Sequence, residues 1–301
     1  MNERRTLDAP ASALMLVLCL IWALQQIVLK ATAHEITPLL QIALRSGLSA
    51  LLIACFMRRH GGLRLTPGVW RSGLLSGVLF AVEFLFVGAG LQLTSAAHMV
   101  VLLYTAPIFV ALGLHRLIPA ERLAPLQWGG IGLAFGGIVL SFFGPGPASA
   151  APDATMLAGD VLGLLAGLAW AATTLMVRCS PLATVPASEA LLYQLAAGFV
   201  LLLPASLLSG QAHFQPGPAG WLSLAFQSVI VSFASYLLWF RLLGRYLASS
   251  LGSFSFLTPL FGVLLGALWL GEALEPRFIA GSALVLAGVL TVSRHHRRPA
   301  S

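Results

Sequence analysis

Polar side chains that interrupt long apolar stretches are the residues of this sequence that could do chemistry. Trp22, Gln25 and Gln26 are spaced so that they share one face of a helix. The two amides could bind the carboxylate and ammonium groups of a zwitterion while the indole ring packs on its side chain. Polar residues deep in a membrane-spanning helix usually face the interior of the bundle. We therefore predict that this face lines a substrate site, the alternative being that the amides join neighbouring helices.

The same spacing recurs in the second half of the chain. Trp170, Thr173 and Thr174 again place an indole ring and two polar groups on one helical face. Two such faces predict one shared binding chamber. The alternative is packing, because Thr hydroxyls also bond between helices and Trp is common at membrane surfaces.

Charged and titratable groups inside apolar stretches are the next candidates, because each is costly to bury there. Glu83 could bind a substrate ammonium or carry a proton, and His98 titrates near neutral pH unless it lies in water at the outer surface. Arg45 could form an ion pair with Glu83 or bind a substrate carboxylate, and Gln194 is its counterpart in the second half. Amphipathic aromatic residues within the stretches complete the candidate set: Tyr104, Tyr193, Tyr236 and Trp239.

Two prolines fall in the middle of apolar stretches, at matching places in the two halves. Pro107 and Pro259 each remove a helical hydrogen bond and bend the helix. We predict that they are hinges that let one end of the bundle move. Glycines in two further stretches predict close helix contact: Gly129, Gly130, Gly132, Gly136, Gly137, Gly281 and Gly288.

The composition requires a lipid environment for these residues. Only 9% of the 301 residues are charged and 58% are hydrophobic, whereas soluble domains carry about 25% charged residues. The net charge of +7 does not indicate a nucleic-acid partner, because the Arg residues lie between apolar runs. Cys19, Cys55 and Cys179 fit neither a disulfide framework nor a zinc site, so we expect no metal and no cofactor.

Ten apolar stretches are long enough to be membrane-spanning helices. The first is retained as a helix, since no convincing cleavage site follows it. The Pro-, Gly- and Ala-rich segment GPGPASAAPDAT divides the ten into a first repeat over residues 1–147, a linker over 148–156, and a second repeat with a basic tail over 157–301. The stretches are 10–31, 36–57, 70–92, 96–116, 124–143, 157–178, 187–209, 219–241, 248–270 and 276–293.

The distribution of Lys and Arg predicts the orientation. With the N-terminus inside, almost all of them fall on the cytoplasmic side, and the outer segments hold only Lys30 and Arg277. Both termini are therefore predicted to be cytoplasmic, in the inner membrane of a bacterium.

Internal similarity supports two copies of one unit. Trp22-Ala23, Ala106-Pro107 and Glu121 recur in the same order as Trp170-Ala171, Thr258-Pro259 and Glu272. Each copy has five spans, an odd number, so the second enters the membrane from the opposite side. Inverted repeats of this kind are a transporter architecture.

Several segments resemble the EamA-type repeat of the drug/metabolite transporter superfamily. They are IWALQQIVLK, LLQIALRSGLSALLI, TAPIFVALGL and PAERLAPLQWGGIGLAFGGIVL in the first half, and GLAWAATTLMVR through FLTPLFGVLLGALWLGEALEPRFIAGSALVLAGVL in the second. The resemblance implies an all-α membrane protein of ten helices, as two inverted five-helix repeats around a central cavity. It also implies export of amino acids or related metabolites, and Arg45 matches the Arg of the EamA second-helix motif.

We therefore predict a secondary transporter that exports aromatic or neutral amino acids by alternating access, as a monomer or homodimer among membrane lipids. No nucleotide-binding GxxxxGK[ST] motif is present, and Gln25 and Gln26 stand where small four-helix multidrug relatives carry a proton-coupling Glu. Multidrug or nucleotide-sugar transport is the alternative within the superfamily. A membrane enzyme is disfavoured because HExxH and GxSxG are missing, and a non-transporting receptor because the loops are too short for a docking domain.

Overall fold

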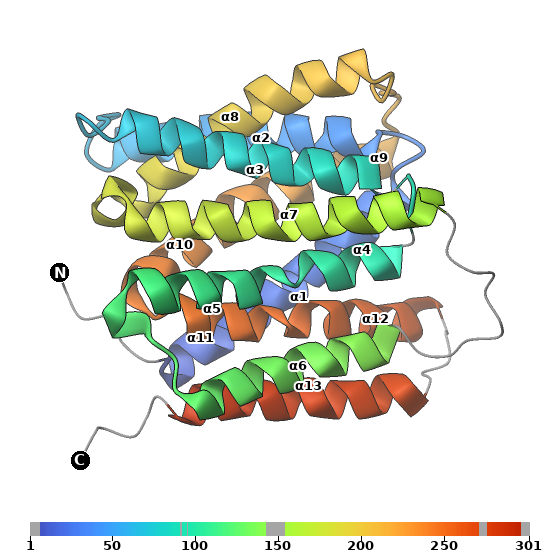
Figure 1. Ribbon diagram of the computed structural model, residues 1–301. Helices are drawn as coiled ribbons and strands as arrows, with labels where there is room; N and C mark the ends of the chain where they lie inside the picture. The colour runs from blue at the N-terminus through green and yellow to red at the C-terminus, as the bar shows by residue number, and fades with distance from the viewer. Residues whose placement is uncertain (1–6, 91, 95, 143–153, 271–275, 296–301) are drawn as a thin grey trace. The chain divides into compact units, whose positions relative to one another are not determined.

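The computed structural model describes residues 7–90, 92–94, 96–142, 154–270 and 276–295, and it is helical in almost all of them (Figure 1). The first half contains α1 (Ala9–Ala31), α2 (Pro38–Arg59), α3 (Trp70–Gly90), α4 (Ala96–Leu103), α5 (Ala106–Leu117), a 3-10 turn (Pro119–Glu121) and α6 (Pro125–Phe142). The second contains α7 (Ala154–Cys179), a 3-10 turn (Pro181–Thr184), α8 (Ala187–Leu208), α9 (Pro218–Ala225), the π-helix η3 (Phe226–Ser235), α10 (Tyr236–Arg245), α11 (Ala248–Ser255), α12 (Leu257–Leu270) and α13 (Pro276–His295). The all-α prediction is confirmed for this part of the chain.

Three of the predicted stretches are not single α-helices, which corrects the sequence prediction. The stretch 96–116 is broken into α4 and α5, with Pro107 as the second residue of α5, and the stretch 248–270 is broken into α11 and α12, with Pro259 as the third residue of α12. Proline has no N–H to bond to the preceding turn, so both breaks fall just ahead of it. The stretch 219–241 changes to a π-helix at Phe226 without a proline in that segment. The hinge role of the two prolines stays a prediction.

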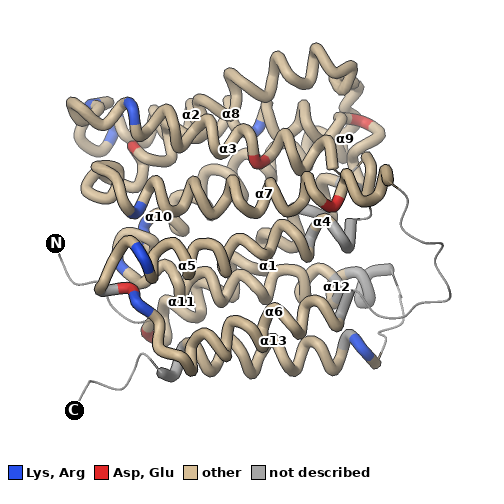
Figure 2. The backbone as a smooth tube through the Cα atoms, in the orientation of Figure 1, with Lys and Arg blue, Asp and Glu red and all other residues tan. Residues whose placement is uncertain are grey.

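Long and apolar helices make up nearly half of the chain. Six helices in the described part are long and apolar enough to cross a membrane by length and composition, and many of their large hydrophobic side chains are exposed, among them Leu51, Leu157 and Leu222. Figure 2 shows long runs of helix without a charged residue. Lipid is the solvent in which such surfaces are stable.

Contacts divide the chain into two compact units that do not follow the sequence repeats. Unit 1 contains residues 1–23, 89–171 and 245–301, and unit 2 contains residues 24–88 and 172–244. Each unit therefore draws helices from both repeats. The chain leaves unit 1 within α1, after Ala23, and again within α7, after Ala171, and these are equivalent residues of the two repeats.

Unit 1 contains a close antiparallel contact between α6 and α13, which are the last helices of the two repeats (Figure 1). A Cβ placed on Gly130 would lie 2.9 Å from the backbone oxygen of Gly288, and one on Gly137 would lie 2.5 Å from that of Gly281. Gly130 is equivalent to Gly281, and Gly137 to Gly288, so the two contacts are reciprocal. The predicted close approach of glycines is confirmed at these positions, since only Gly lets backbones come so near.

Two hydrogen bonds in unit 1 show the same reciprocity. The hydroxyl of Tyr246, ahead of α11, donates to Asp8 at 2.9 Å, and that of Thr94, ahead of α4, donates to Asp160 at 2.6 Å. Thr94 and Tyr246 stand at equivalent places in the two repeats, and each donates to an aspartate near the start of the other repeat's first helix. An approximate two-fold relation between the repeats produces such pairs.

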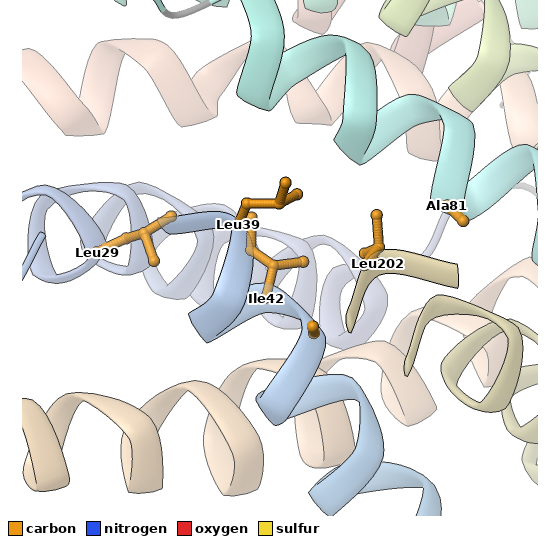
Figure 3. Close-up of a cluster of buried hydrophobic side chains, with 6 residues drawn as sticks. Leu29, Leu39, Ile42, Ala81 and Leu202 are labelled. Carbon is orange, nitrogen blue, oxygen red and sulfur yellow. The ribbon is translucent and has the colours of Figure 1, made fainter. Parts of the chain in front are cut away.

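Unit 2 is built around α2 and α8, the second helices of the repeats. Gly47 of α2 lies against the ring of Phe199, and Gly198 of α8 lies against the ring of Phe80. A cluster of buried apolar side chains forms part of the core of this unit (Figure 3). Its buried members come from α1, α2, α3 and α8: Leu29, Leu39, Ile42, Ala43, Ala81 and Leu202.

A carboxylate on the loop between α1 and α2 holds the start of α9. Oε2 of Glu35 accepts hydrogen bonds from the backbone N–H groups of Gly217 and Gly220, both at 2.7 Å. These are the cap residue and the third residue of α9, where N–H groups have no partner within the helix. Ile36 and Phe214 add a short antiparallel bridge beside it. Glu35 therefore ties the two loops together and offsets the positive end of the helix.

Replacing Glu35 by alanine is expected to lower the free energy of unfolding by about 1–2 kcal/mol, the usual cost of losing a helix cap. Thermal melting of the purified protein in detergent measures it. His34→Ala is the matched control, because His34 lies 3.7 Å from Glu35 but its side chain is 76% exposed. Equal losses in the two variants would show that the cap contributes nothing beyond the exposed contact between His34 and Glu35.

Candidate functional site

One face of α2 carries polar side chains one turn apart inside the apolar interior of unit 2. Gln41, Arg45 and Ser49 are spaced by four residues, so they line up on one side of the helix. The opposing side is formed by α9 and η3, which pack on α2. All three side chains are buried, and Arg45 is the largest fully buried side chain of the described chain at 1% exposure. Arg45 is therefore the centre of the site.

The guanidinium of Arg45 is held by neutral acceptors from three other helices. Its Nη1 donates to Oε1 of Gln25 at 2.9 Å and to Oε1 of Gln227 at 2.6 Å, and its Nη2 donates to the hydroxyl of Tyr236 at 3.3 Å. The ring of Phe84 lies 5.2 Å from the guanidinium carbon, in cation–π range. Hydrogen bonds from a cation are the stronger kind, so this arrangement fixes the guanidinium in place.

The remaining edge of the guanidinium has no partner. Nε of Arg45 is buried and makes no hydrogen bond within the described part of the chain. Glu83 interacts electrostatically with Arg45, but no carboxylate oxygen of the described residues lies within 4.0 Å of the guanidinium. The direct Arg45–Glu83 ion pair considered from the sequence is thus not formed in this structure. A cation buried without an anion in contact is costly, which makes Arg45 and its neighbours the candidate functional site of unit 2.

Helix α3 presents an acidic and aromatic face to the same place. Phe80, Glu83 and Phe84 are three and four residues apart and share one face. The rings of Phe80 and Phe84 pack edge to face, with centroids 4.9 Å apart, and Phe80 also packs against the ring of Tyr236 at 6.3 Å. Glu83 is buried at 9% exposure. Rings, a carboxylate and a guanidinium are therefore gathered within unit 2.

The π-helix η3 supplies Gln227, which orients the cluster. Besides accepting from Arg45, Gln227 donates from Nε2 to the backbone oxygen of Gln25 at 2.9 Å. These two bonds fix which end of the amide faces the cation. Wide π-helical turns occur often at functional sites. In η3 the turn coincides with the position of Gln227, which is fully buried.

A second buried polar group lies one turn away on α2. Nε2 of Gln41 donates to the hydroxyl of Ser223, and the hydroxyl of Thr32 lies 3.0 Å from that of Ser223 and 3.4 Å from Oε1 of Gln41. These three side chains satisfy one another, which is how helices in lipid are joined. We assign them a structural role.

The predicted residues of unit 1 have surroundings of their own within that unit. Trp22 is buried in α1, and Tyr104 packs edge to face on Trp170, with centroids 5.4 Å apart. Pro107 lies near Gly252, whose added Cβ would be 3.4 Å from the proline ring. A role of these residues in binding stays a prediction.

The remaining predicted residues of unit 2 have separate surroundings. Thr173 and Thr174 are buried in α7, and the ring of Tyr193 packs on Gly73. Gln194 donates to the hydroxyl of Ser76 at 2.7 Å, and Trp239 is half-buried in α10. The side chains of Gln26 and His98, and the whole of Glu272, lie outside the described residues.

Sequence reasoning missed Gln227 and the two phenylalanines. Gln227 is an amide within an apolar stretch, which is the same signal that made Gln25 a candidate. The sequence therefore offered the means to predict it. Phe80 and Phe84 carry no such signal, because phenylalanine is common in apolar helices. No group of three His, Cys, Asp or Glu side chains that could hold a metal ion occurs in the described residues.

The sequence matches the EamA-like transporter family over residues 9–143 and a second time over residues 157–294. The chain belongs to this family. The predicted family membership is confirmed, and both matches together cover nearly the whole chain. The protein is a multi-pass transporter of the inner membrane, as the family, the apolar helices and the relatives agree.

Relatives of this EamA-like transporter match it over nearly the full chain. An uncharacterized transporter of Archaeoglobus fulgidus is 29% identical over 97% of this chain and 100% of its own length. A probable amino-acid metabolite efflux pump of Salmonella typhimurium is 28% identical over 92% of each chain, and an uncharacterized inner membrane transporter of Escherichia coli is 26% identical over 97% of this chain and 93% of its own. A solved crystal structure shares the fold, with a TM-score of 0.82 and 20% identity over 98% of this chain and all of that chain.

Proposed function

We propose that this EamA-like transporter exports small amphipathic metabolites, namely aromatic or neutral amino acids. The observation that carries the proposal is the buried Arg45, held by neutral side chains and lacking an anion in contact, in the middle of apolar helices. Such groups in membrane proteins mark substrate pathways. The Salmonella relative named as a probable amino-acid metabolite efflux pump supports the same class.

Alternating access without ATP is the proposed mechanism. No nucleotide-binding motif is present in the sequence. The helix breaks ahead of Pro107 and Pro259 lie at equivalent places of the two repeats, and paired breaks could let helix ends move while the rest stays packed.

Ten spans with both termini in the cytoplasm are the proposed topology. It predicts that the loop after α1 and the loop after α7 lie on opposite sides of the membrane. In a chain whose three native cysteines are replaced, a membrane-impermeant thiol reagent should label Ala33→Cys from outside and Ala183→Cys only after the cells are opened. Labelling of both from the same side would contradict the inverted repeat.

Counterflow in proteoliposomes tests the proposed substrate class. Vesicles loaded with an unlabelled aromatic or neutral amino acid should accumulate the labelled compound, and Trp170→Ala should reduce the rate. Repeating the assay with and without a pH gradient separates coupled from facilitated transport. Exchange of lipophilic cations alone would instead favour multidrug transport, and exchange of nucleotide sugars alone would favour that branch of the superfamily.

A further inference from the structure

We propose that Arg45 and Glu83 bind the two ends of a zwitterionic head group, Arg45 its carboxylate and Glu83 its ammonium, while Phe80, Phe84 and Tyr236 contact its side chain. This assignment rests on the proposed export of amino acids and names the residues that select them. All five residues belong to unit 2.

The carboxylate of the ligand is assigned to Arg45 because of the hydrogen bonds that the guanidinium makes and lacks. Arginine binds a carboxylate most strongly through two parallel N–H groups. The end of the Arg45 guanidinium is occupied by Gln25, Gln227 and Tyr236, while its Nε is buried and unbonded. A carboxylate on the Nε side would satisfy this group and supply the anion that the buried cation lacks. Gln25 and Gln227 hold the guanidinium but carry no charge, so they leave its positive charge available.

The ammonium of the ligand is assigned to Glu83 because of the surroundings of its carboxyl group. Its carboxylate is buried and makes no hydrogen bond to any side chain in the described parts of unit 2. It acts electrostatically on both Arg45 and Tyr236, so the carboxyl group and the guanidinium lie near each other without touching. An acidic and a basic group held apart suit a ligand that carries both an ammonium and a carboxylate. Binding of the ligand would neutralise both, which neither a simple cation nor a simple anion can do.

The aromatic contacts follow from the face of α3. Phe80 and Phe84 flank Glu83 on this face, and the ring of Tyr236 packs against Phe80. Aromatic rings favour edge-to-face or offset contact with further rings. A substrate whose head group lies between Arg45 and Glu83 would place its side chain against these rings, which favours aromatic amino acids over small ones.

The alternative is that Arg45 and Glu83 have only a structural role and never contact substrate. Three probes separate the two. Phenylalanine carries both charges, 3-phenylpropionate lacks the ammonium, and phenethylamine lacks the carboxylate. Each is offered as an inhibitor of labelled phenylalanine counterflow by the purified full-length transporter in proteoliposomes, and direct binding by the detergent-solubilised protein gives a readout independent of turnover.

Arg45→Gln should weaken binding of phenylalanine and 3-phenylpropionate by about 30-fold or more, the usual cost of removing one partner of a buried charged hydrogen bond, and leave phenethylamine binding within about twofold. Glu83→Gln should weaken the binding of phenylalanine and of phenethylamine by a similar factor, and it should leave the binding of 3-phenylpropionate unchanged. The opposite selectivities are the expected result, because a general loss of folding lowers binding of all three probes together. Arg178→Gln is the matched control, a second buried arginine of unit 2 that donates to the backbone oxygen of Leu243 at 3.0 Å.

Equal losses for all three probes in both variants would overturn the assignment, and so would wild-type selectivity in either variant. These outcomes leave the proposed function intact if wild-type vesicles still exchange amino acids. Wild-type vesicles that exchange no amino acid would overturn the proposed function itself, and this assignment with it.

Discussion

Replacing Gly137 by alanine is expected to lower the free energy of unfolding by about 2–3 kcal/mol, because one added methyl group meets backbone on the facing helix. The Cβ would lie 2.5 Å from the oxygen of Gly281 and 2.8 Å from the nitrogen of Val285. Neither atom can turn away, as a flexible side chain could, so α6 and α13 would have to separate. Thermal melting in detergent, followed by size-exclusion elution, measures the loss.

The neighbouring glycine supplies the control. An added Cβ on Gly136 would have no atom within 4 Å, and alanine favours helix over glycine by about 1 kcal/mol. Gly136→Ala should therefore be neutral or slightly stabilising. If the two alanine variants melted alike, the close contact between α6 and α13 would not be what holds these helices together.

The second expected result concerns Gln227. Replacing it by leucine should lower the free energy of unfolding by about 3 kcal/mol and abolish transport. Leucine has similar size but cannot accept from Nη1 of Arg45 or donate to the backbone oxygen of Gln25. A buried N–H of a cation would then lack one of its acceptors, and leaving a charged group unsatisfied costs more than losing a neutral hydrogen bond. Melting measures the first effect and phenylalanine counterflow the second.

Ser206→Ala is the matched control for that variant. Ser206 is also fully buried in unit 2, but its hydroxyl donates only to the oxygen of Leu203, at 2.9 Å, three residues before it. Its loss should cost no more than about 1 kcal/mol and leave transport unchanged. A similar cost in the two variants would mean that Gln227 does not position Arg45.

Gln25, Arg45, Glu83 and Tyr236 could be named from the sequence as candidate site residues because a polar group is expensive inside an apolar stretch. That cost is visible in the sequence one residue at a time. Pro107 and Pro259 were visible for a similar reason, since the missing N–H is a property of the residue itself. The contacts of these residues were not visible, and the ion pair first considered for Arg45 is replaced by bonds to Gln25, Gln227 and Tyr236.

Composition, helix positions and the internal repeat could all be read from the chain, because each depends on local order and on the requirement that helices in lipid be apolar. The grouping of both repeats into each compact unit, the π-helix η3 and the aromatic face of Phe80 and Phe84 could not. Several apolar helices of this protein, among them α3, α6 and α8, have faces of similar hydrophobicity, so the pattern of residues does not say which face meets which neighbour. The packing of the folded chain determines which faces meet. It also brings Arg45 and Glu83 near each other without contact.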